Sequence, residues 1–368
     1  MNISDLGWND FFRQNFEAFE SDDMIPARVC REYKNIYHVV SEAGELTAEV
    51  SGRFRHEALS RADFPAVGDW VAITPRSGET RATIHKRLPR QSGFSRKAVL
   101  SGGNPDSGGK TDEQVLAANV DTVFLVSGLD GNYNIRRIER YLTVAWDSGA
   151  APVVVLNKAD ICPDIEAVVD EIDKIAIGVP VLAVSAARDE GMDKIAEHIP
   201  AGKTAAFLGS SGVGKSTIIN RLLGEERLKT SEVRADDQRG RHTTTHRELL
   251  LLPSGGIVID TPGLREIQLW DDEAGLSRTF ADIEELAERC RFRDCRHENE
   301  PGCAVREALE NGSLDQSRFQ NYLKMQKEFK HLKIRKDVKT QRETYRAFDK
   351  RIRRVLKEKN ELKKKGLL

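Results

Sequence analysis

The feature that most constrains this chain is a glycine-rich segment, GSSGVGKS, at residues 209–216. It fits the pattern G-x-x-x-x-G-K-[ST], and it lies between an apolar run, TAAFLG, and a stretch with helical spacing, TIINRLL, as a phosphate-binding loop requires. Glycines let backbone N–H groups surround a phosphate, and the start of a helix adds its positive end. The alternative is a Gly-rich turn with a chance lysine, which the strand–loop–helix context disfavours.

The side chains of this loop have separate predicted roles. Lys215 can bridge the β- and γ-phosphates of a nucleoside triphosphate, and the Ser216 hydroxyl can ligate Mg²⁺. The predicted phosphate-binding residues are Gly209, Ser210, Ser211, Gly212, Val213, Gly214, Lys215 and Ser216.

The pattern around the loop is that of an α/β domain. Continuous apolar runs at 120–129, 151–157, 180–186 and 204–209 are typical of buried parallel strands. Stretches with helical spacing separate them, at 135–147, 165–175 and 192–198. Two more strands, near 249–263, are close enough to form a hairpin. We therefore expect a doubly wound α/β domain over residues 120–275.

A second motif, Asn157-Lys158-Ala159-Asp160, follows one of these strands. A carboxylate here can accept hydrogen bonds from N1–H and from the exocyclic amine of guanine, a donor pair that adenine lacks. An ATP-dependent enzyme is disfavoured for this reason, although the segment by itself could be a helix N-cap. Ser185-Ala186 follows the next strand and can add a backbone N–H for guanine O6. Together with the phosphate loop, these motifs predict a guanine nucleotide site.

Two further segments are candidates for Mg²⁺ and γ-phosphate contacts. Asp260 ends an apolar strand in the sequence DTPG, where it can hold Mg²⁺ through water and Gly263 can meet the γ-phosphate. Thr244, in GRHTTT, is the favoured switch threonine for Mg²⁺, with Thr243 and Thr245 as alternatives. A solvated loop without a role is the competing interpretation of that segment.

The order of these motifs is unusual. In ordinary GTPases the phosphate loop comes first and the guanine motifs last. Here the guanine motifs, at 157–160 and 185–186, precede the loop at 209 and the DTPG segment at 260. The set is complete but circularly permuted, which is tolerated where the original termini lie close together.

Three cysteines and one histidine fall within fourteen residues: Cys290, Cys295, His297 and Cys303. Three thiolates and an imidazole form a tetrahedral Cys₃His set for one structural Zn²⁺, with no position left open for catalysis. Three buried cysteines and a surface histidine are the alternative. The chain beyond residue 270 is otherwise predicted to be helical, so we expect a helical zinc-binding domain over residues 276–323.

Net charge hides a strong asymmetry. The chain has 57 Lys and Arg against 58 Asp and Glu, but residues 324–368 alone carry 18 basic and 6 acidic side chains. Such a basic helical tail suits a polyanion partner, although it could also be a solvated helix that aids solubility.

At the N-terminal end of the chain, short β-type runs at 26–89 predict a small closed barrel after an N-terminal arm. We assign residues 1–95 to the arm and barrel, and 96–119 to a Gly-rich linker.

These motifs closely resemble the ribosome small-subunit-dependent GTPase A (RsgA, also called YjeQ) family. The resemblance is carried by VGDWV, RLPRQSGFSR, NKAD, GSSGVGKST, GRHTTT, DTPG and CxxxxCxHxxxxxC, in this order, over about residues 26–305. It implies an OB-type β-barrel, a circularly permuted P-loop GTPase domain and a zinc-binding domain.

The resemblance also implies what the protein does. It implies late maturation of the small ribosomal subunit in the bacterial cytoplasm, with GTP hydrolysis stimulated by that subunit. Thr217 joins the phosphate-binding residues by this resemblance, and His242 becomes the candidate that positions the attacking water. Leu264 stands where Ras-like proteins place a catalytic glutamine, and leucine cannot orient water. The alternative is therefore a nucleotide-gated RNA-binding scaffold with negligible catalysis.

Partners and location follow from the same expectations. We expect ribosomal RNA to bind the barrel, the zinc domain and the tail, although the barrel could instead bind protein or act as a spacer. No apolar run approaches the roughly 18 residues that a membrane span needs. The start of the chain, MNISDLGWNDFF, lacks the pattern of a signal peptide. We expect a cytoplasmic monomer that does not enter membranes.

Overall fold

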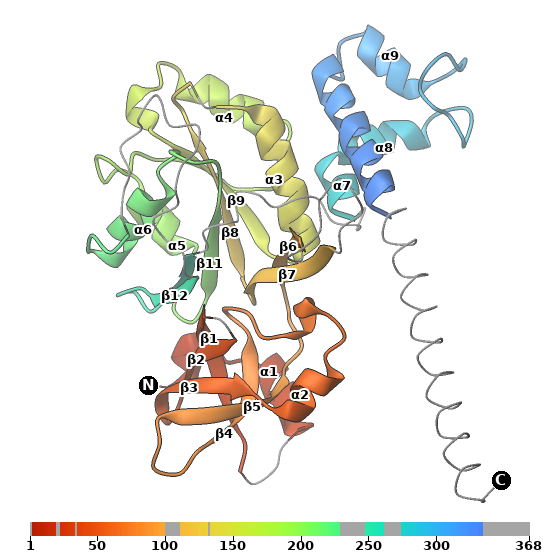
Figure 1. Ribbon diagram of the computed structural model, residues 1–368. Coiled ribbons are helices and arrows are strands. Elements are labelled where there is room, and N and C mark those ends of the chain that lie inside the picture. The colour runs from red at the N-terminus through yellow and green to blue at the C-terminus, as the bar shows by residue number, and fades with distance from the viewer. Residues whose placement is uncertain are drawn as a thin grey trace, which may run out of the picture. The chain divides into compact units, whose positions relative to one another are not determined.

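The structure is a computed structural model that describes residues 2–19, 23–33, 35–99, 111–131, 133–228, 247–260 and 274–333. It divides into two compact units, Met1–Gln268 and Leu269–Leu368. The first unit holds the barrel and the α/β domain together (Figure 1). The second unit begins at Leu269, slightly before the boundary at residue 276 that the sequence suggests.

Five strands form the N-terminal barrel. They are β1 (Ile25–Tyr33), β2 (Ile36–Ser41), β3 (Gly44–Val50), β4 (Trp70–Pro75) and β5 (Arg81–Arg87). The order β1-β2-β3-β5-β4 closes because β4 also pairs with β1. The β3–β5 pair is parallel, whereas the other pairs of the barrel are antiparallel. This closed barrel confirms the OB-type barrel expected from the resemblance.

Apolar residues at alternate strand positions fill the barrel. Its buried core consists of Ala27, Val29, Tyr37, Val39, Leu46, Ala48, Val50, Phe54, Val71, Ile73, Ala82 and Ile84. Helix α2 (Gly52–Glu57) follows β3, and its N-cap Ser51 accepts a hydrogen bond at Oγ from the Phe54 N–H at 3.1 Å. The N-terminal arm contains a 3₁₀ turn, η1 (Ile3–Leu6), and helix α1 (Asp10–Glu17). The arm is anchored by an aromatic cluster in which Trp8 and Trp70 meet edge to face at 4.7 Å.

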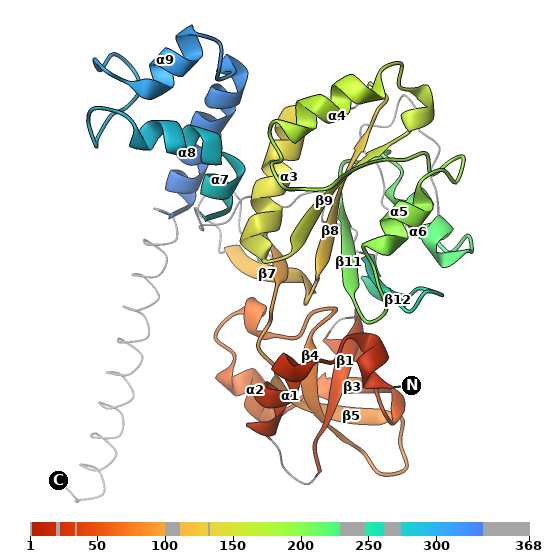
Figure 2. The same cartoon turned by 180° about the vertical axis from the view of Figure 1, so that it is seen from behind.

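The α/β domain has the predicted alternation of strands and helices. The strands are β8 (Thr122–Gly128), β9 (Ala151–Asn157), β10 (Val181–Ala183), β11 (Thr204–Leu208), β12 (Glu248–Leu251) and β13 (Ile257–Asp260). The helices are α3 (Ile135–Ser148), α4 (Ile165–Asp173), α5 (Met192–Glu197) and α6 (Lys215–Leu223). Figures 1 and 2 show α3 and α4 over one face of the sheet and α5 and α6 over the other.

Strand order explains where a ligand can bind. The order is β10-β9-β8-β11-β13-β12, in which β12 alone runs antiparallel and forms the predicted hairpin with β13. The carboxyl ends of β9, β10, β11 and β13 therefore meet at one edge, where doubly wound sheets bind their ligands. The apolar runs of β8, β9 and β11 are buried between the two helix layers, as the continuous hydrophobic pattern predicts.

The predicted linker at 96–119 contains regular structure. Strands β6 (Gly93–Val99) and β7 (Thr111–Ala118) pair as an antiparallel ribbon outside the main sheet. Residues 100–110 lie outside the described part of the chain. The Gly-rich composition of that segment suggested a linker, but the flanking segments satisfy each other's backbone hydrogen bonds, and Leu116 and Ala117 are fully buried.

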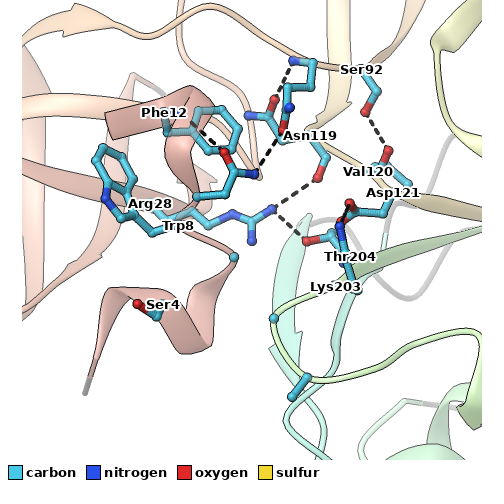
Figure 3. A pocket seen from close by; sticks show the side chains of 15 residues that line it. Ser4, Trp8, Phe12, Arg28, Ser92, Asn119, Val120, Asp121, Lys203 and Thr204 are labelled. Atoms are coloured by element: carbon cyan, nitrogen blue, oxygen red, sulfur yellow. Dashed lines mark hydrogen bonds and ion pairs between the residues drawn. The ribbon is translucent and has the colours of Figure 1, made fainter. Parts of the chain in front are cut away.

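A buried guanidinium joins the parts of the first unit (Figure 3). Arg28 of β1 is 2% exposed and donates to carbonyl oxygens of Leu6 in the arm, Gly68 before β4 and Asn119 after β7, and to Thr204 Oγ1 at the start of β11. Burial lowers the pKa of Arg28 to about 10, against the opposing effect of Asp121 and Asp69, so it stays charged at neutral pH. A cavity of about 200 Å³ lies beside it.

The described part of the second unit is helical apart from turns and an irregular stretch between α8 and α9. Its helices are α7 (Ala274–Thr279), α8 (Ala281–Glu288), α9 (Ala304–Glu310) and a helix over residues 316–333. An ion pair between Arg318 and Asp282, at 2.7 Å, links the last helix to α8. Buried apolar residues from several helices form the core: Leu276, Phe280, Ile283, Val305, Leu314, Phe319, Tyr322, Met325 and Phe329.

The predicted basic tail at 324–368 does not begin as a separate element. The helix that starts at residue 316 continues through residue 324, and Met325 and Phe329 are each only 1% exposed. The apolar spacing of Tyr322, Met325 and Phe329 continues the packed face of that helix past the predicted boundary. Residues 334–368 lie outside the described part. Among the described helices, none has both the length and the apolarity needed to span a bilayer.

Candidate nucleotide-binding site and metal centre

Three of the predicted motifs meet at the carboxyl edge of the parallel sheet. Asn157 ends β9, Ser185 lies two residues after the end of the short strand β10, and Gly209 follows β11. The motifs are far apart in the sequence, and the strand order brings them together, with β8 between β9 and β11. This edge is the candidate nucleotide site.

The glycines of the loop are required by its close packing. A Cβ at Gly209 would lie 2.4 Å from the carbonyl oxygen of Val126 on β8. Gly214 has φ +97°, and a Cβ there would lie 2.1 Å from Asn157 Nδ2. Lys215, the first residue of α6, donates from Nζ to the carbonyl oxygens of Gly209 and Ser210 at 2.7 and 2.6 Å. The loop thus curves around its own lysine at the start of a helix, which is the geometry of a phosphate cradle.

Asn157 connects all three motifs. The residue is 3% exposed, its Nδ2 donates to the carbonyl oxygen of Val213 in the phosphate loop at 2.8 Å, and its Oδ1 accepts from the Ala186 N–H at 3.0 Å. Because each buried partner would otherwise lack a hydrogen bond, this amide fixes the guanine motifs against the phosphate loop. The bracing contact was not foreseen from the sequence, where Asn157 was a candidate only for contacting guanine.

The Asp160 carboxylate is held in its ionised form. Ser185 donates from Oγ to Asp160 Oδ1 at 2.7 Å, and Arg188 Nε lies 3.5 Å from Oδ2. The Ser185 hydrogen bond, together with a backbone N–H and the charge of Arg188, holds the pKa of Asp160 below its ordinary value despite partial burial. An ionised carboxylate at this position can accept the two N–H donors of guanine.

Lys158 and Ala159 shape the turn between these residues. Lys158 adopts φ +66°, and its ammonium pairs with Asp130 after β8. The Ala159 N–H donates to the Val184 carbonyl oxygen at 3.0 Å, which ties the motif to the strand end beside it. The predicted guanine residues are therefore all brought to one place.

The predicted magnesium ligands are only partly within the described residues. Ser216 and Thr217 lie in the first turn of α6, and Asp260 ends β13, the neighbour of β11. These oxygen donors are of the kind that Mg²⁺ prefers, so the described part of the site fits that ion. Thr243, Thr244, Thr245, His242, Gly263 and Leu264 lie outside the described residues, so their predicted roles stay predictions.

Two arginines at this edge were missed. Arg137 of α3 donates from Nη1 to Ser210 Oγ in the phosphate loop at 3.2 Å. Arg221 of α6 donates to the Ala186 carbonyl oxygen at 3.2 Å. Both stand in ordinary amphipathic helix patterns, which contain no signal for a contact across the sheet edge.

The four predicted zinc ligands converge in the second unit. Their ligand atoms all lie within 4.8 Å of one another. Cys290 Sγ lies 3.8 Å from Cys303 Sγ and 3.6 Å from His297 Nδ1, which is itself 3.4 Å from Cys303 Sγ. Tetrahedral Zn²⁺, with bonds of about 2.3 Å to sulfur and about 2.0–2.1 Å to nitrogen, needs donor separations of about 3.5–3.8 Å. The donor set therefore fits zinc.

Local contacts favour the metal-binding form of three of these donors, Cys290, His297 and Cys303. Cys303 caps α9, and its Sγ accepts from the Arg306 N–H at 3.4 Å. Burial opposes ionisation of Cys290, but the N–H groups of Val305 and Ala304 bring the pKa of its thiol below the ordinary value. Burial also lowers the pKa of His297, against Glu300 and Glu284, which favours the neutral imidazole that binds metals.

Comparison with known proteins decides the family. The RsgA GTPase family matches residues 88–270, and a family described as 50S ribosome-binding GTPase matches residues 204–361. The small ribosomal subunit biogenesis GTPase RsgA of Opitutus terrae is 52% identical over 337 residues, which is 89% of this chain and 90% of that protein. This chain belongs to the RsgA GTPase family. The RsgA protein of Syntrophotalea carbinolica is 48% identical over 344 residues, 93% of each chain.

Solved structures agree with this RsgA assignment. YjeQ from Thermotoga maritima has a TM-score of 0.62 at 28% identity and covers 84% of this chain and 98% of its own. YloQ, described as a circularly permuted GTPase, has a TM-score of 0.58 at 24% identity, covers 85% of this chain and 96% of its own, and supports the fold alone. The protein is thus an RsgA-type GTPase, and the permutation inferred from motif order is confirmed.

Proposed function

We propose that this protein binds GTP with Mg²⁺, hydrolyses it in response to the small ribosomal subunit, and thereby acts in a late step of that subunit's assembly. The relatives above are named for small ribosomal subunit biogenesis. The observation that carries the nucleotide part is the Asn157 amide, which joins the phosphate loop to the guanine motifs.

Nucleotide recognition divides between two ends of the site. Asp160, with the Ala186 N–H close by, faces the guanine base, and the N–H groups of Gly209 to Thr217 surround the phosphates with Lys215. Ser216, Asp260 and Thr244 would hold Mg²⁺, which neutralises charge that develops on the phosphates during transfer. The site disfavours adenine because adenine offers the half-buried Asp160 carboxylate no pair of N–H donors.

The attacking water needs a residue other than glutamine. Leu264 has no polar atom, so we assign the orientation of the water to His242. Leu264 is also the observation that favours the second candidate function, a nucleotide-gated RNA-binding scaffold. The two candidates differ in whether subunits accelerate hydrolysis.

Ribosomal RNA is the partner we propose for the barrel, the zinc unit and the basic residues near the C-terminus. We propose that the protein acts as a monomer in the cytoplasm, where bacterial subunits are assembled. The Cys₃His set holds one Zn²⁺ in a structural role because all four positions are supplied by the protein.

Single-turnover GTP hydrolysis tests this proposal. Rates are compared for the protein alone and with added small subunits, large subunits or protein-free ribosomal RNA. We expect small subunits to give the largest acceleration, by at least about tenfold. Equal rates with and without small subunits would reject the enzyme and leave the scaffold.

A further inference from the structure

A short loop at residues 185–187 follows β10 and contains the predicted Ser185-Ala186 motif. Ser185 and Glu190 exchange two backbone hydrogen bonds of 3.0 Å each, which close the chain on itself just beyond this loop. Ser185 and Ala186 are each 1% exposed, whereas Ala187 is exposed. We call residues 185–187 the base loop.

The base loop is held from two sides. At the end of β9, Asn157 accepts at Oδ1 from the Ala186 N–H at 3.0 Å. From α6, Arg221 donates from Nε to the Ala186 carbonyl oxygen at 3.2 Å, and its Nη2 lies 3.5 Å from the Ala187 carbonyl oxygen. Arg221 therefore links the base loop to the helix that begins at the phosphate loop.

Hydrogen bonds within the protein leave one N–H of the base loop available to a ligand. The Ser185 N–H donates to the Glu190 carbonyl oxygen, and the Ala186 N–H donates to Asn157. Among the described residues, the Ala187 N–H has no hydrogen-bond acceptor. The peptide bond between Ala186 and Ala187 is trans, so this N–H points away from the carbonyl oxygen that Arg221 holds.

We propose that Arg221 is a positioning residue for guanine recognition, which fixes this peptide so that the Ala187 N–H donates to the exocyclic oxygen of the base. The inference rests on the proposed function, which makes GTP the ligand. A cation that binds a peptide carbonyl also polarises the peptide, and this strengthens its N–H as a donor. Adenine carries an amino group in place of that oxygen, so a donor at Ala187 disfavours adenine.

The opposite end of the base is recognised by contacts that do not include Arg221. Asp160 accepts from Ser185 Oγ at 2.7 Å, and Arg188 Nε lies 3.5 Å from its other oxygen. This carboxylate is the predicted acceptor for the N1–H and the 2-amino group of guanine. The two ends can therefore be tested separately by changing one atom or group of the base at a time.

The test combines variants of Arg221 with altered bases. Affinities for GTP, for 6-thioguanosine triphosphate, whose sulfur is a weak acceptor, and for inosine triphosphate, which lacks the 2-amino group, are measured by competition against a fluorescent guanine nucleotide. We expect Arg221→Ala to weaken binding of GTP and inosine triphosphate about tenfold each. Binding of the sulfur analogue should weaken only about twofold, because that ligand has already lost the contact to Ala187.

Two further variants make the comparison specific. Arg221→Lys keeps the charge but not the planar fork, so it should show the same pattern at about threefold, and it carries the test if Arg221→Ala does not fold. Arg53→Ala removes an exposed arginine of α2 that pairs with Glu57 of its own helix, and it should change none of the three affinities. Melting temperatures check that each variant is folded.

Two outcomes would overturn the assignment. Losses of equal size for all three nucleotides would leave Arg221 with a structural role only. Wild-type affinity for GTP in Arg221→Ala would show that the base loop keeps its position without this side chain. By contrast, a wild-type protein that binds ATP as tightly as GTP would reject the proposed function's choice of ligand, whatever the Arg221 variants do.

Discussion

The nucleotide edge and the Cys₃His cluster both gather residues from separate positions, but different forces hold them. At the nucleotide edge, parallel strands and the buried Asn157 amide hold the motifs together through hydrogen bonds within the protein. Three of the four cluster residues are incompletely buried, on an irregular stretch between α8 and α9. We infer that the fold prepares the nucleotide site, whereas the metal itself organises the cluster.

Loss of the metal should therefore have the largest effect. Cys303→Ala removes a donor and the cap of α9, so we expect the variant to hold no zinc, where the wild type holds one per chain. Metal analysis measures the content, and limited proteolysis should find new cleavage between residues 289 and 303. Cys162→Ala, at a cysteine outside the cluster, is the control and should keep the zinc. A wild-type protein without zinc would contradict the assignment.

Loss of the two Asn157 side-chain hydrogen bonds should have the next largest effect. Asn157→Ala leaves the Val213 carbonyl and the Ala186 N–H without their partner, at a cost of about 1–3 kcal/mol each. We expect the affinity for GTP to fall by about 100-fold and the melting temperature to drop. Asn157→Asp keeps the acceptor for the Ala186 N–H but loses the donor to the Val213 carbonyl. Its affinity for GTP should therefore lie between those of the wild type and Asn157→Ala. An unchanged affinity for GTP in Asn157→Ala would contradict the claim that the Asn157 hydrogen bonds prepare the nucleotide site.

Selectivity for guanine depends on one carboxylate. In Asp160→Asn the side chain no longer accepts both guanine donors, so we expect GTP affinity to fall by about 30-fold and xanthosine triphosphate to bind better than GTP. Competition against a fluorescent guanine nucleotide measures both. The zinc content should stay at one per chain. Unaltered preference for GTP would show that another group reads the base.

The smallest effect is expected from Ser185→Ala. The Ser185 hydroxyl is the largest cause of the lowered pKa of Asp160, so its loss should raise that pKa toward the ordinary value of 3.8. Asp160 is ionised at pH values above its lowered pKa, and it becomes protonated as the pH falls through that pKa. GTP is titrated into Ser185→Ala and into the wild type between pH 7 and pH 3.5. At neutral pH the variant should bind GTP roughly threefold more weakly than the wild type. In the variant, the loss of binding in acid should begin at a higher pH than in the wild type.

Local motifs explain what could be predicted from the sequence. The phosphate loop, the NKAD segment and the Cys₃His spacing each specify their chemistry within a few residues, and the alternation of apolar runs with helical spacing specified the sheet that positions them. The barrel followed from short strands with turn signals, and its closure was confirmed by the β1–β4 pair.

Contacts between segments that are distant in the sequence explain what could not be predicted. Arg28 and Asn157 each join elements that no spacing rule relates, and their residue types are common on protein surfaces. The β6–β7 ribbon was missed because its glycine-rich centre dominated the composition. The tail boundary was missed because net charge hid the apolar face that Met325 and Phe329 continue.

One measurement tests most directly the contrast between the nucleotide site and the Cys₃His cluster. A fluorescently labelled GTP analogue is titrated into the wild-type protein before and after its zinc is removed. If strands and the Asn157 amide alone prepare the nucleotide site, the dissociation constant should stay within about twofold while the 289–303 segment becomes open to protease, and ATP should fail to compete in both forms. A loss of GTP binding on removal of zinc, or competition by ATP, would contradict the account.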